Sequence, residues 1–121
     1  MLQSRLIDSF CGSDALLIVA CKLFQNRIAA FAAIVCRLDQ AERDKASDAD
    51  RDDLQRRADG LRTEWQAIAQ AVVATRAAHP AGRRAKADAL HAYHQHVGGT
   101  KGIEIDLAHS LVADLRTARG A

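Results

Sequence analysis

The feature that most constrains the fold is a stripe of apolar residues that recurs at alternating steps of four and three. It comprises Leu17, Cys21, Phe24, Ile28, Phe31, Val35 and Leu38. This spacing places the side chains on one face of an α-helix over three heptads. The face is widened by Leu16, Ala20, Leu23, Ala30 and Ile34, which predicts burial against more than one neighbour. Ser13 and Asp14 suit a helix start, since the Ser side chain can cap free N–H groups and a carboxylate is favourable at the positive end of the helix dipole.

A second stripe with the same spacing follows after a break in phase. Continuing the first stripe would place Glu42, Lys45 and Asp52 in the core, so the first helix should end between residues 39 and 47. Ser47-Asp48 is typical of a new helix start. The second stripe comprises Leu54, Ala58, Leu61, Trp65, Ile68 and Val72, and its helix should end near residue 78. No Gly or Pro lies between residues 12 and 60, which would allow one continuous rod, but the change of phase favours an antiparallel hairpin.

Two shorter helices are expected in the rest of the chain. His79-Pro80 marks a boundary, because the residue before Pro disfavours α conformation and Pro fits the first turn of a helix. One helix should run from Pro80 to about residue 97. Another should run from residue 103 to 118, with Leu107, Leu111 and Leu115 at four-residue steps on its core side. A short turn is expected before residue 12, through Leu6, Ile7 and Phe10.

These patterns predict an all-α, four-helix bundle-like fold in one domain, residues 1–121, with a long antiparallel helical hairpin closed by two shorter helices. A single Pro and 4% aromatic residues argue against a β-sandwich or barrel. The net charge of +2 gives no global attraction to nucleic acid or anionic lipid.

The cysteines and the charges of the first helix predict a cytoplasmic protein without a membrane span. Cys11, Cys21 and Cys36 form no C-x-x-C pair and no even set, which favours a reducing compartment. The apolar stretch 15–36 carries Lys22 and Arg27 in its middle, and each charge costs about 2.5–3.5 kcal/mol at a bilayer centre. Asp8 and Asp14 also interrupt the pattern of a secretory signal.

A histidine cluster on the expected third helix is a candidate metal site. Asp88, His91 and His94 recur every three residues, within an arc of ~120° at ~100° per residue. Two His residues three apart can bind Zn²⁺ or a similar ion, and His109 from the last helix could complete the set. The alternative is that these side chains face solvent, where protonated imidazoles suit the last turn of a helix.

A basic bend around Pro80 is a candidate anion or nucleic-acid site. Arg83, Arg84 and Lys86 lie near a helix start, where positive charge opposes the helix dipole and an anionic partner would relieve the conflict. No recognition-helix motif and no aromatic stacking platform accompanies these residues, which makes nucleic acid the less favoured partner. The alternative is a solvated bend whose charges pair with the acidic second helix.

Other patterns are better explained by structure than by chemistry. The glycines of residues 98–102 lack the order of a phosphate-binding loop and should reverse the chain. The acidic start of the second helix lacks the Gly and Glu of an EF-hand. Cys21 and Trp65 lie on the stripes, so we expect an inert buried thiol and a core indole.

Several short motifs together resemble a loose group of short uncharacterised bacterial helical proteins. They are Asp14-Ala15 followed by Leu17, Cys21 and Phe24, the lone Trp65, Pro80-Ala81 before Ala85-Lys86-Ala87, and Leu107-Ala108, Ser110-Leu111 and Ala113-Asp114-Leu115. The resemblance implies an all-α fold and a bacterial origin. It implies no activity, because none is established for the group.

With no reactive cluster in the sequence, the favoured function is a non-enzymatic interaction or adaptor protein that uses no cofactor. Metal binding and weak nucleic-acid binding are the alternatives. Ala29, Ala32 and Ala33 would permit close approach of another helix, so we expect a homodimer in addition to another protein partner.

Overall fold

The computed structural model describes residues 14–98 and 102–120. Within these ranges it is all-helical and contains α2 (Ala15–Arg43), α3 (Asp48–Ala74), α4 (Pro80–His96) and α5 (Ile103–Gly120). The predicted all-α class is therefore confirmed. The expected cap by Ser13 and the expected turn through Leu6, Ile7 and Phe10 lie outside the described residues.

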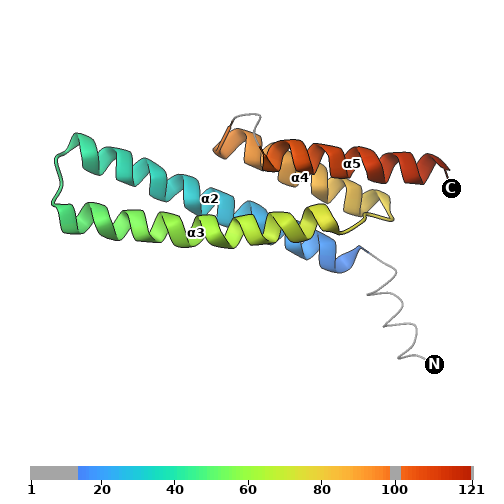
Figure 1. Cartoon of the computed structure of the whole chain (residues 1–121), viewed down its shortest axis with the longest axis horizontal. Coiled ribbons are helices and arrows are strands. Elements are labelled where there is room, and N and C mark those ends of the chain that lie inside the picture. Colours follow the sequence, from blue (N-terminus) through green and yellow to red (C-terminus); the bar gives the residue numbers. More distant parts are fainter. Residues whose placement is uncertain (1–13, 99–101, 121) are drawn as a thin grey trace, which may run out of the picture.

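The two long helices form a hairpin, not a continuous rod. α2 ends at Arg43, inside the predicted window, and Lys45 takes a left-handed conformation with φ of 55° that ends the helix and turns the chain. The Ser47 hydroxyl then caps α3 by accepting a hydrogen bond from the Asp50 N–H at 3.2 Å. α3 returns alongside α2, and the turn end of the hairpin extends beyond α4 and α5 (Figure 1).

The core lies where the two stripes meet α4 and α5. α2 packs against α3 and α4, and α5 packs against the same two helices. The centre is an aromatic cluster of Phe24, Phe31, Trp65 and Tyr93, with neighbouring ring centroids 5.6–6.4 Å apart. Val35 and Leu38, farther along the first stripe, are only half-buried.

Asp14 sets the bend between α3 and α4. Its buried carboxylate accepts hydrogen bonds from the backbone N–H groups of Ala78 at 3.1 Å and His79 at 2.8 Å. These two N–H groups therefore bond to the side chain of Asp14, at the start of α2, and do not continue the hydrogen-bond pattern of α3. As a result α3 ends at Ala74, four residues before the expected end, and Thr75 is extended.

Glycine at position 82 makes this arrangement fit. A Cβ atom there would lie 2.1 Å from Asp14 Oδ2, well inside any real contact distance. The first turn of α4 therefore lies directly against the Asp14 side chain, which fixes the start of α2 to the start of α4.

Candidate functional site

The histidine cluster does not converge on one point. Asp88 and His91 border a shallow depression between α2 and α4. His94 instead faces α5, where its Nδ1 atom lies 2.9 Å from Glu104 Oε1. His109 is exposed on α5. Among the described residues no group of three His, Cys, Asp or Glu side chains is placed to hold a metal ion.

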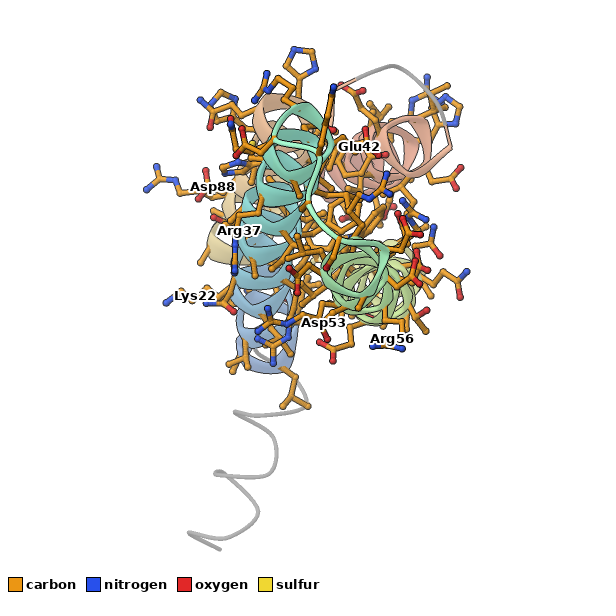
Figure 2. The ribbon with its side chains drawn as sticks, turned by 90° about the vertical axis from the view of Figure 1, so that its left-hand side faces the viewer. Lys22, Arg37, Glu42, Asp53, Arg56 and Asp88 are labelled. Atoms are coloured by element: carbon orange, nitrogen blue, oxygen red, sulfur yellow. The ribbon has the colours of Figure 1, made fainter. Side chains whose placement is uncertain are left out.

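The basic bend is also divided. Arg84 borders an open groove of about 440 Å³ between α2 and α4, together with Lys22 and Asp88. Lys22 and Asp88 lie on the same outer side of the molecule (Figure 2). Arg83 is half-buried and borders a different depression, beside Arg76 near the α3–α4 bend. The two arginines thus lie on different sides of α4.

Lys86 belongs to the interior, so its prediction as an anion ligand was wrong. It is 1% exposed, and its Nζ atom donates to Asp114 Oδ2 at 2.6 Å and to Ser110 Oγ at 2.8 Å. The Ser110 hydroxyl donates in turn to the Val73 carbonyl oxygen at 3.0 Å. This buried polar network joins α3, α4 and α5, and it leaves Lys86 no access to an external anion.

The sequence did contain a signal for this network. Lys86 lies seven residues before Tyr93, and Asp114 lies seven residues after Leu107, so both charges occupy core positions of their helices. Two opposite charges at core positions are typical of a buried ion pair, because neither is stable inside a protein alone. The pairing itself crosses 28 residues and depends on how α4 and α5 are aligned.

Cys21 and Trp65 are core residues, as predicted. Cys21 is fully buried, and this burial raises the pKa of its thiol to about 11, despite the nearby charge of Lys86. The thiolate needed for nucleophilic chemistry is therefore scarce near neutral pH. Trp65 is 4% exposed and packs edge-on against Phe24 and Phe31.

The surface carries two groups of large apolar side chains, which include three that the sequence had led us to expect in the core: Leu16, Leu23 and Leu115. On α2, Leu16 is 69% exposed, Val19 61% and Leu23 40%. We call these three residues the α2 face. α2 has two helical neighbours, as the wide stripe predicted, but neither of them covers Leu16 or Leu23.

The second group lies on α5. Ile105 is 43% exposed, Val112 44% and Leu115 47%. Leu115 was expected in the core and is not there, because four-residue steps drift by ~40° each around a helix. The inward side of α5 instead carries Leu107 and Asp114, which are buried.

One further property of α2 bears on where the protein resides. Its length and the mean hydropathy of 1.5 in its most apolar window would allow it to span a membrane. By itself this observation is weak, since the core helix of a globular protein or an N-terminal signal meets the same criterion.

A scan of the chain against protein-family models finds none that matches, and searches of curated proteins and of solved structures find no match either.

Proposed function

We propose that the protein is a non-enzymatic adaptor that binds a helix of another protein through the α2 face. The observation that carries the proposal is the exposure of Leu16, Val19 and Leu23 on the outside of a well-packed helix. Single exposed leucines are common on protein surfaces, but three large apolar side chains within two helical turns form one patch.

The spacing of these side chains suits a helical partner. They stand at positions i, i+3 and i+7, so they line one side of α2. An amphipathic helix that binds in this way presents anchors at the same spacing. Complete burial of such a side chain contributes on the order of 2 kcal/mol, so three of them can support a reversible complex.

Polar residues border the α2 face, as they do at known interfaces. Arg27 lies one turn after Leu23 and forms an exposed ion pair with Glu64 of α3, with 2.8 Å between Nε and Oε2. A charged rim beside an apolar centre is the usual arrangement of a reversible interface. The adaptor would act in the cytoplasm, where the free thiol of the exposed Cys36 stays reduced.

The architecture that presents the α2 face is, we infer, a four-helix bundle in which α4 and α5 close one half of the hairpin. The helix pairs that contact one another support this arrangement. In this bundle, the buried charged side chains that could serve in catalysis already have structural partners. Asp14 accepts hydrogen bonds from backbone N–H groups, and Lys86 forms an ion pair with Asp114.

Site-specific photo-crosslinking in the native cell would test the proposal. A photoreactive amino acid at Val19 should capture one defined protein, whereas the same group at Arg56, exposed on α3, should not (Figure 2). The captured protein, once purified, should bind the wild-type chain and should lose at least about tenfold in affinity for the double variant Leu16→Ser/Leu23→Ser.

Both leucines are exposed, so this variant should keep its fold, which circular dichroism would check. Equal capture at both positions, or unchanged affinity of the folded double variant, would refute the proposal.

A further inference from the structure

The groove between α2 and α4 combines an apolar lining with positive charge. Its volume of about 440 Å³ is within the range of small-ligand sites. The half-buried Ile18 of α2 lines it, together with Pro80 and the buried Ala85 of α4. Lys22 borders the groove from α2, and Arg84 borders it from α4. The groove therefore offers a ligand both apolar contact and two cations.

The charges follow an order along the groove. Asp88 borders both this groove and the shallow depression farther along α2 and α4, so it marks one end of the groove. Lys22 follows Ile18 by four residues, or ~6 Å along α2. Arg84 follows Pro80 by the same distance along α4, and Asp88 follows one turn later. A ligand that lies along the groove therefore meets apolar surface first, then two positive charges and last a carboxylate.

The two cations are not used in pairing within the fold. Within residues 14–98 and 102–120, neither Lys22 nor Arg84 forms an ion pair, and Asp88 forms none either. Two positive charges and one negative charge leave the groove with a net charge of +1. The positive end of the α4 dipole already faces the buried Asp14 carboxylate, so the attraction for an anion comes from the two side chains.

We propose that the groove binds a small organic acid that has one carboxylate and a short aliphatic body. The carboxylate lies between the Lys22 ammonium and the Arg84 guanidinium, which can donate two parallel hydrogen bonds to it. The aliphatic body lies against Ile18 and Pro80 and is short, because the apolar part of the groove begins only ~6 Å from the two cations. A single negative charge matches the net charge of the groove.

This ligand site is separate from the α2 face and does not depend on the adaptor function. Leu16 and Leu23 lie ~100–120° around α2 from Lys22, so a helix bound to them leaves the groove open. Arg84 was predicted to bind an anion at the basic bend. In the proposed site it does so in the groove, with Lys22 as the second cation.

A nuclear magnetic resonance titration of the isotope-labelled chain with hexanoate tests the proposal. The backbone amide signals of Lys22, Arg84 and Ala85 should shift and saturate. The Kd should be on the order of millimolar, because the groove is open and the ligand has few atoms. Two matched ligands divide hexanoate into its parts, since 1-hexanol lacks the charge and acetate lacks the aliphatic body. Each should bind at least about tenfold more weakly.

Four single variants test the role of each charge. Lys22→Gln and Arg84→Gln each remove one cation and should weaken hexanoate binding by about three- to fivefold. Asp88→Asn removes a repulsive carboxylate and should strengthen binding by at least about twofold. Arg56→Gln, on α3, is the matched control and should bind like the wild type. All four side chains are exposed, so the variants should keep their fold, which circular dichroism would check.

Shifts that fail to saturate by about 20 mM hexanoate would overturn the proposal. So would Lys22→Gln and Arg84→Gln chains that bind as tightly as the wild type. Binding of 1-hexanol as tight as that of hexanoate would show that the cations play no part, and equally tight acetate would indicate an adventitious ion only. The Leu16→Ser/Leu23→Ser chain should bind hexanoate like the wild type, so this test and the test of the adaptor function can fail separately.

Discussion

Replacing Lys86 by Met should remove a large fraction of the stability of the fold. Met keeps the length of the side chain but lacks the ammonium group, so the buried Asp114 carboxylate loses its counter-charge. Removing one partner of a buried pair costs about 3–5 kcal/mol, because the remaining charge is left without solvent or partner. Domains of this size have a total free energy of unfolding of only about 5–15 kcal/mol.

Urea unfolding followed by circular dichroism measures this loss directly. The urea concentration at the midpoint should fall, with no change in the dependence of the unfolding free energy on urea. For a chain of 121 residues, each kcal/mol of lost stability corresponds to about 4 °C in Tm. The variant should therefore melt about 12–20 °C below the wild type. Lys22→Met is the matched control, because Lys22 is exposed on α2 (Figure 2), and it should change stability by less than about 0.5 kcal/mol.

The double variant Lys86→Met/Asp114→Leu separates pairing from packing. It removes both charges together, so it should recover most of the loss and lie within about 1–2 kcal/mol of the wild type. Equal losses in Lys86→Met and Lys22→Met would refute the burial argument. A double variant as unstable as the sum of its two single variants would refute the pairing.

Three further perturbations test other parts of the fold. Gly82→Ala would place a methyl group against Asp14 and should cost about 1–3 kcal/mol in thermal or urea unfolding, whereas Gly60→Ala, with nothing within 4 Å, should stabilise α3 by about 0.5–1 kcal/mol. Burial raises the pKa of the Cys21 thiol from 9.0 to about 11. The unfolded chain therefore loses this proton at a lower pH than the folded chain, so stability falls as pH rises between these values. In Cys21→Ala that part of the decline should be absent. Burial also raises the pKa of Tyr93, the one tyrosine in the chain, so its absorbance titration should have a midpoint above 10 that falls to 10 in urea.

Local patterns predicted the helices well. The heptad stripes located both long helices, and the break in phase predicted the turn that Lys45 makes. Pro80 marked the first residue of α4, since its ring suits the first turn. These features depend on spacing within about one helical turn, which a single sequence contains in full.

Features that depend on how helices align were predicted poorly. The role of Lys86 depends on Asp114, which lies on another helix, and composition around the bend suggested an exposed basic cluster instead. Asp14 suited a helix start, but its hydrogen bonds reach residues 64 and 65 positions away. Leu115 was assigned to the core because it follows Leu107 and Leu111 at four-residue steps, and periodicity alone does not say which apolar side of α5 faces inward.

The Lys86 network decides that question for α5. Turning α5 about its axis to bury Val112 and Leu115 would withdraw Asp114 from Lys86 and Ser110 from Val73, and would leave two charges without partners inside the protein. That cost exceeds the gain of about 1.5–3 kcal/mol in total from burying two aliphatic side chains that are each already about half covered. We infer that the network fixes the rotation of α5 and thereby keeps Val112 and Leu115 on the outside of the molecule.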